Sequence, residues 1–163
     1  MADLGAARAE WESALASVPD QALTYLKGGD DYALGGLLLH VNWVLLHYHR
    51  LLNELIAGGF TAMDVNDPPG EQRAVNDRAR VGLNAPERQL VMSEMDALHA
   101  SVTRVVTGLA DADWARKTPV VYEAGQDPHP TSPEDVIGWL RDHYREHVSQ
   151  SADLVAEWRS SKA

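Results

Sequence analysis

Hydrophobic residues recur at every third or fourth position along most of this chain, and the alternation typical of β-strands is nearly absent. The first amphipathic segment runs from Asp3 to Val18 and ends at Pro19, a residue that cannot continue a helix. Its apolar residues share one side: Leu4, Ala7, Trp11, Leu15 and Val18. The spacing predicts an α-helix that packs one face against a core.

Two further long helices are predicted in the middle of the chain. The turn residues Gly28–Asp31 precede the second helix, which ends at the glycine pair Gly58–Gly59. The third follows Asn84, Pro86 and Glu87, a combination typical of an N-cap, a first helical turn and a capping box. These signals place the helix boundaries without any long-range information.

The last long helix is predicted over Glu134–Trp158, where Ser132 or Thr131 can cap the start. Shorter elements are expected in the connections. A helical stretch is predicted over Glu71–Val81, and the irregular connection 110–132 contains a short extended piece over Pro119–Tyr122.

Four long amphipathic helices in 163 residues predict an all-α four-helix bundle. No internal repeat or linker is evident, so we expect residues 1–163 to form a single domain of ordinary core size. The middle connections are long for a simple up-and-down bundle. A topology with a crossover connection is therefore expected as an alternative.

Composition removes several classes of function. The formal net charge is −10 and no basic stripe is present, so nucleic acid is not expected as a partner. Without cysteine, the chain has no disulfide, thiolate metal ligand or cysteine nucleophile. No signal peptide is visible and the apolar runs are far shorter than a membrane span. We therefore expect a cytoplasmic protein without membrane contact.

The chemistry of the chain centres on its histidines. His143 and His147 are four residues apart, so their rings lie on one face of the last predicted helix. His147 falls roughly 30° from the centre of the apolar arc, and His143 lies on its shoulder. Buried ring nitrogens need partners, because an unpaired buried polar group is costly. A metal ion is one such partner, and a hydrogen-bonding neighbour is the alternative.

A metal site would need a third ligand from another segment. On the second predicted helix, His40 lies at the edge of the apolar stripe and is favoured over His47, which points further outward. The weaker candidates are expected in solvent, in a loop or at the edge of the core, namely His49, His99, His129 and Glu54.

These motifs resemble those of the DinB-like (YfiT-like) metalloenzymes, a superfamily of four-helix bundles with a His…His-x-x-x-His metal triad. The matching stretches are 31–43 and 139–150, with a similar middle segment over 76–114. The resemblance implies that the metal ligands are His40, His143 and His147. One departure is Tyr32-Ala33, where relatives often open the second helix with Trp-Ser, and we expect Asp30 or Asp31 to replace the lost cap.

Three histidines on one divalent ion leave at least one coordination position open, as in catalytic zinc sites. Zinc and nickel are the favoured ions, and iron and manganese would accept the same ligands. The resemblance implies two activities toward a small-molecule substrate. One is transfer of a low-molecular-weight thiol to an electrophile, and the other is metal-dependent hydrolysis. The abundant apolar helix surface is general support for a homodimer.

The sequence leaves the catalytic residues unknown. Asp142 and Glu146 stand beside the ligands but point out of the apolar arc, and Trp139 and Tyr144 are more typical of core packing than of a pocket. A ferritin-like di-iron site and a zinc-protease site are disfavoured, because Glu-x-x-His and His-Glu-x-x-His are absent. A bundle that binds metal or ligand without catalysis, or that acts only as a scaffold, is the remaining alternative.

Overall fold

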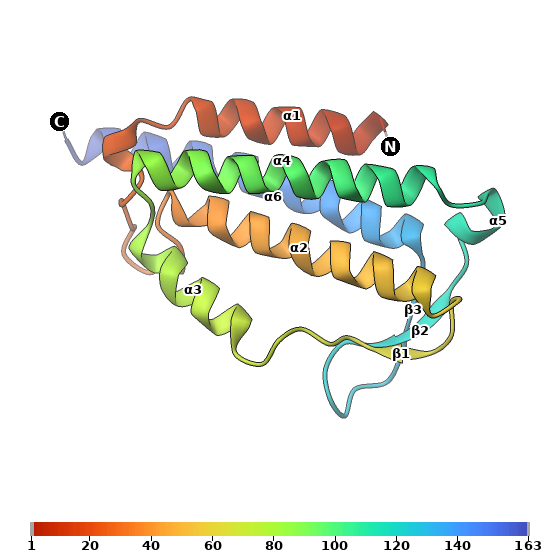
Figure 1. The fold of residues 1–163 in the computed structure, drawn as a ribbon. Coiled ribbons are helices and arrows are strands. Elements are labelled where there is room, and N and C mark those ends of the chain that lie inside the picture. Colours follow the sequence, from red (N-terminus) through yellow and green to blue (C-terminus); the bar gives the residue numbers. More distant parts are fainter. Residues whose placement is uncertain (1, 163) are drawn as a thin grey trace.

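The computed structural model describes residues 2–162, and most of them are helical. Four long helices form a bundle: α1 (Ala2–Ala16), α2 (Gly36–Ala57), α4 (Ala85–Thr107) and α6 (Pro133–Ser160) (Figure 1). Between them lie shorter helices, namely the 3₁₀ turn η1 (Asp20–Ala22), α3 (Glu71–Val81) and α5 (Asp111–Trp114). The predicted four-helix bundle is confirmed, and α3 has the predicted bounds.

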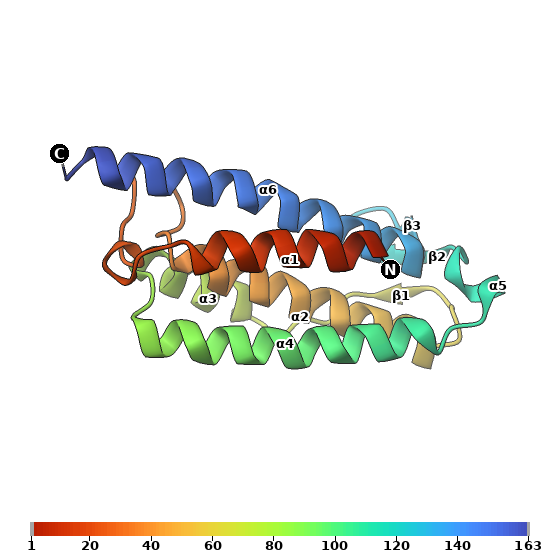
Figure 2. The ribbon, with the colours of Figure 1, turned by 90° about the horizontal axis from the view of Figure 1, so that it is seen from above.

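The bundle has a crossover topology. Helices α1 and α6 run in one direction, whereas α2 and α4 run in the other (Figures 1 and 2). Helix α2 packs against α3, α4 and α6, and α1 packs mainly against α6. Because α2 and α4 are parallel, the chain must return along the bundle between them, and α3 is part of that return. The crossover expected from the long connections is therefore present.

Capping boxes fix the starts of two bundle helices. At α4, the Asn84 side chain accepts a hydrogen bond from the Glu87 amide at 2.9 Å, and Glu87 accepts one from the Asn84 amide at 2.8 Å. At α6, Ser132 and Asp135 form the same reciprocal pair. Each box satisfies amide donors that the first turn leaves free. The second box sets the start of the helix that carries two of the candidate histidines.

The start of α2 differs from the prediction. The helix begins at Gly36, several residues after the Gly28–Asp31 turn, and its N-cap is Gly35 rather than Asp30 or Asp31. The backbone before it is held by long-range hydrogen bonds from Ala33, Leu34 and Gly35 to carbonyls of residues 79, 25 and 23, respectively. These bonds connect the segment to other parts of the chain, and no local sequence pattern predicts them.

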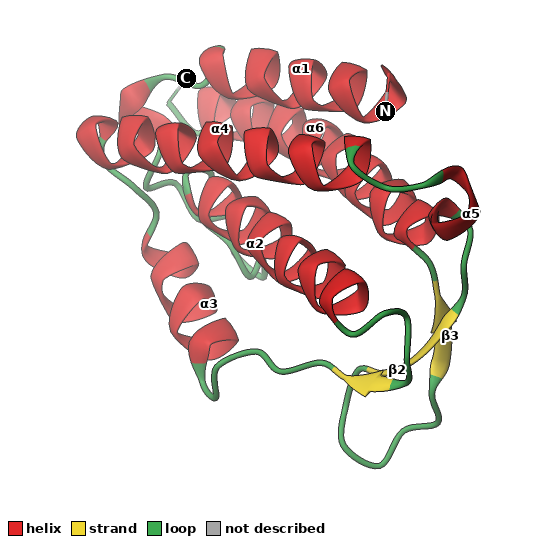
Figure 3. Ribbon diagram, turned by 45° about the vertical axis from the view of Figure 1, so that its right-hand side comes forward, coloured by secondary structure: helices red, strands yellow, loops and turns green. Residues whose placement is uncertain are grey.

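A small sheet joins the two long connections at the end of the bundle where α2 ends and α6 begins (Figure 3). Its strand order is β1-β2-β3, with β1 parallel and β3 antiparallel to β2. The extended piece predicted near Pro119 is β2. The other strands have only two or three residues and were not predicted. The strands are β1 (Met63–Asp64), β2 (Thr118–Val121) and β3 (His129–Thr131).

One continuous cluster of buried apolar side chains joins the long helices and reaches from Leu4 in α1 to Val155 in α6. Its largest fully buried member is Trp11, which lies on the face of α1 that the spacing predicts. Among the helices of residues 2–162, none is long and apolar enough to cross a membrane. The homodimer and the cytoplasmic location stay predictions.

The close approach of α2 to α3 depends on Gly36, one helical turn before His40. A Cβ atom at this position would lie 1.8 Å from the backbone oxygen of Ala79. We expect Gly36→Ala to lower the free energy of unfolding by at least about 1–3 kcal/mol. The backbone of Ala79 cannot move away from the added Cβ atom as a flexible side chain could. Denaturant unfolding of the purified protein measures this change.

Gly138 in α6 is the matched control, because a Cβ atom there would meet no atom within 4 Å. Gly138→Ala should leave stability unchanged or raise it by up to about 1 kcal/mol, since alanine is the better helix former. Equal effects of the two substitutions would contradict the role of Gly36.

Candidate metal centre

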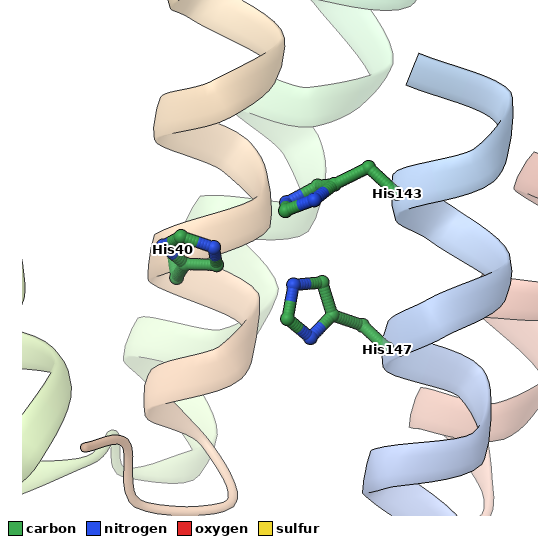
Figure 4. Close-up of side chains that lie close together, drawn as sticks. All are labelled: His40, His143 and His147. Atoms are coloured by element: carbon green, nitrogen blue, oxygen red, sulfur yellow. The ribbon is translucent and has the colours of Figure 1, made fainter. Parts of the chain in front are cut away.

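His40 from α2 and the pair His143 and His147 from α6 come together at the contact line between these helices, which we call the α2–α6 seam. Figure 4 shows all three rings pointing into the same space. The centroid of the His40 ring lies 5.1 Å from each of the other two, which are 4.4 Å apart. One ring nitrogen of each histidine lies within 4.8 Å of the others. The three residues named by the sequence are therefore clustered.

Each of these histidines has a buried ring nitrogen without a hydrogen-bond partner among the described residues. The atoms are Nδ1 of His40, Nε2 of His143 and Nε2 of His147. Buried polar atoms are nearly always paired, so three unpaired nitrogens in one cluster require an explanation. Ligand nitrogens around one zinc ion lie roughly 3–4 Å apart, given bonds of about 2.0–2.1 Å. The ring nitrogens, all within 4.8 Å of one another, could close around one divalent ion after small movements of the rings.

The environment keeps the three rings uncharged at neutral pH. Burial, with proximity to His147 as a smaller cause, lowers the pKa of His40 to about 4 and that of His143 to about 3. Burial also lowers the pKa of His147, against the opposing effect of its hydrogen bond to Gln150. A neutral imidazole has a free lone pair, which is the form that binds a metal ion.

Gln150 orients one ligand of the cluster. Its Oε1 lies 2.7 Å from Nδ1 of His147, so Nδ1–H donates and the lone pair of Nε2 faces the other two rings. Such partners of metal-binding histidines fix the tautomer and the ring orientation. Sequence reasoning missed Gln150. The available signal was its position three residues after His147, on the neighbouring face of the same helix.

Two aromatic rings border the cluster. Tyr32, in the segment before α2, stacks on His40 with ring centroids 4.5 Å apart. Trp11 of α1 lies behind His147 at 6.3 Å. Trp11 is fully buried, so this side of the cluster faces the core, while His40 and His143 are only partly buried. The remaining access is from the surface.

The other histidines do not join this cluster. His47 pairs with Asp67 at 2.5 Å. His49 is half-buried and bonded to Ser101 at 2.8 Å, so the prediction that it is solvated was wrong. His129 lies in strand β3 and not in a loop. Glu54 is not part of the cluster either.

His99 is a core histidine. Its Nε2 lies 2.5 Å from the hydroxyl of Tyr144, and both residues are buried. Burial lowers the pKa of His99 to about 4, so the neutral ring accepts the hydrogen bond of the tyrosine. A hydrogen-bonding neighbour was the expected alternative to a metal ion as the partner of a buried ring nitrogen, and His99 has such a neighbour. Its partner Tyr144 lies in the core, as predicted.

Within residues 2–162 no carboxylate joins the three histidines. Asp142 and Glu146 are exposed, as their positions on α6 predict, and Asp142 pairs with Arg141. The donor set is therefore neutral, and it cannot offset the charge of a divalent ion. An anionic ligand at an open position is favoured for that reason.

One comparison with known proteins identifies the family of this chain. The model of the DinB superfamily matches residues 2–151, which is nearly the whole chain. This chain belongs to the DinB superfamily. A comparison with curated proteins gave no match.

Proposed function

We propose that this protein is a metal-dependent thiol S-transferase that acts on small electrophiles, with one divalent ion held by His40, His143 and His147. Zinc or nickel suits three imidazoles best, and iron or manganese is the alternative. The observation that carries the proposal is the convergence of three histidine rings from two helices, with one ring nitrogen of each within 4.8 Å of the others. Each ring also buries a nitrogen that has no hydrogen-bond partner among the described residues. A bound ion would make a water or thiol at its open position more acidic.

The residues around the cluster favour a thiol over water as the nucleophile. A hydrolase gains from a carboxylate that takes a proton from water, and none joins the cluster within the described residues. A thiol needs less help, because its ordinary pKa of about 8.5 is far below that of water. The neutral histidines also add no negative charge that would repel a thiolate.

The first prediction from the proposed function concerns metal content. Protein purified without an affinity tag should contain about one divalent ion per chain by elemental analysis, and His143→Ala with His147→Ala should remove it. His47→Ala is the matched control, since this histidine lies on α2 near His40 but pairs with Asp67. Metal retained by the double variant would mean that the ligands lie elsewhere.

The second prediction concerns Gln150. Gln150→Leu should weaken metal binding by about tenfold to a hundredfold, because the ring of His147 loses the partner that orients it. Gln150→Glu keeps an acceptor and should bind nearly as well as the parent protein. Ser149→Ala changes an exposed neighbour and serves as the control. Equal affinity of all three variants in a chelator competition would rule out this role.

The third prediction concerns the nucleophile. An activated aryl halide should be consumed only when a small thiol such as glutathione is present. In this reaction the sulfur forms a bond to carbon, the halide leaves, and the thiol proton passes to solvent. His143→Ala should reduce the rate to background. Release of halide at the same rate without thiol would refute the transferase and favour the hydrolase.

A further inference from the structure

A second group of side chains forms a hollow farther along the α2–α6 seam. It has a volume of about 500 Å³, within the range of about 300–1,000 Å³ that ligand pockets span. We call it the aromatic pocket, and its lining residues are Tyr48, Tyr122, Gln126, Asp127, His129 and Trp139. They come from α2, from α6, from strand β3 and from the loop between β2 and β3.

The rings of the aromatic pocket are held in fixed positions around Trp139. Its ring centroid lies 5.8 Å from Tyr48, 6.2 Å from Tyr122 and 6.1 Å from His129, with ring planes inclined by 39° to 73°. The hydroxyl of Tyr122 is tied to Oγ1 of Thr131 at 2.9 Å. The four rings border one hollow, and aromatic surroundings of this kind bind alkylated ammonium groups.

The charge of the pocket favours a cation. Asp127 is the one acidic residue of its lining, and no lysine or arginine is part of that lining. Asp127 is exposed, and none of the ion pairs among residues 2–162 includes it. Burial raises the pKa of Tyr48, and it raises that of Tyr122 to about 12, so both hydroxyls stay neutral. A carboxylate or phosphate would find no positive partner here.

The aromatic pocket lies within reach of the histidine cluster. Trp139 precedes His143 by one turn of α6, about 6 Å along the helix axis. On α2, Tyr48 follows His40 by about 12 Å, with the buried Val44 between them. The aromatic pocket and the three histidines therefore lie about one to two helical turns apart along the same seam.

We infer that the aromatic pocket binds an organic cation, namely an alkylated ammonium group, through the rings of Tyr48, Tyr122 and Trp139 and the carboxylate of Asp127. A second step rests on the proposed function. In that step the ammonium group is one end of the substrate, and its binding orients the reacting end toward the histidine cluster.

The test titrates the purified full-length protein with choline and with its uncharged isostere, in which a tert-butyl group replaces trimethylammonium. The indole N–H resonance of Trp139, assigned by its absence in Trp139→Phe, should shift saturably with choline and far less with the isostere. Trp139→Leu should weaken choline binding, followed by calorimetry, by about tenfold, and Trp139→Phe by less, because a benzene ring keeps part of the cation–π attraction.

Matched controls separate the pocket from general effects on folding. Trp158→Leu removes another partly buried tryptophan of α6, and it should bind choline like the parent protein. Asp127→Asn should weaken binding by up to about fivefold, as expected for an exposed charge pair, whereas Asp153→Asn on the surface of α6 should not.

The outcomes distinguish this inference from the metal centre, because the metal content of each sample is measured alongside. Equal binding of choline and the isostere, or undiminished choline binding by Trp139→Leu, would overturn the cation site even in protein that holds its metal. Protein that binds choline but no metal would keep the pocket and overturn only its role beside a metal centre.

Discussion

Three histidines of the α2–α6 seam each bury a ring nitrogen that has no partner among residues 2–162, and the rest of the structure depends on this constraint. Leaving such atoms unpaired costs free energy, so a fold that keeps them together needs a compensating ligand or a compensating function. Because His40 comes from one helix and His143 and His147 from another, their spacing holds only while the two helices stay in register.

Several features away from the cluster maintain that register. The capping box at Ser132 sets the start of α6, and the close contact of Gly36 with Ala79 sets the start of α2 against α3. The crossover connection leaves α2 in the middle of the bundle, in contact with α3, α4 and α6. Trp11 adds the wall that α1 places behind His147. A site carried on packed helices keeps its geometry better than one on loops.

The elements predicted best are those with local causes. The helical spacing and the caps at Asn84 and Ser132 gave the long helices within a few residues, because these signals depend on neighbours in sequence. The delayed start of α2 and the strands β1 and β3 depend on backbone hydrogen bonds between distant segments, which no local pattern encodes. In the site, the pairing of His143 and His147 follows from one helix, whereas His40 was selected over His47 by helical geometry together with the family resemblance.

The antiparallel course of α2 and α6 would let the proposed metal centre and the proposed cation site share one seam. Moving from His40 to Tyr48 along α2 corresponds to moving from His143 back to Trp139 along α6, so both helices present first imidazoles and then aromatic faces. The imidazoles are neutral and offer lone pairs to a metal ion, which can also bind an incoming anion. The aromatic rings and Asp127, in contrast, attract a cation and repel an anion. A molecule with an ammonium group at one end would therefore bind in a single direction, because its reversed orientation places the positive end against a metal ion.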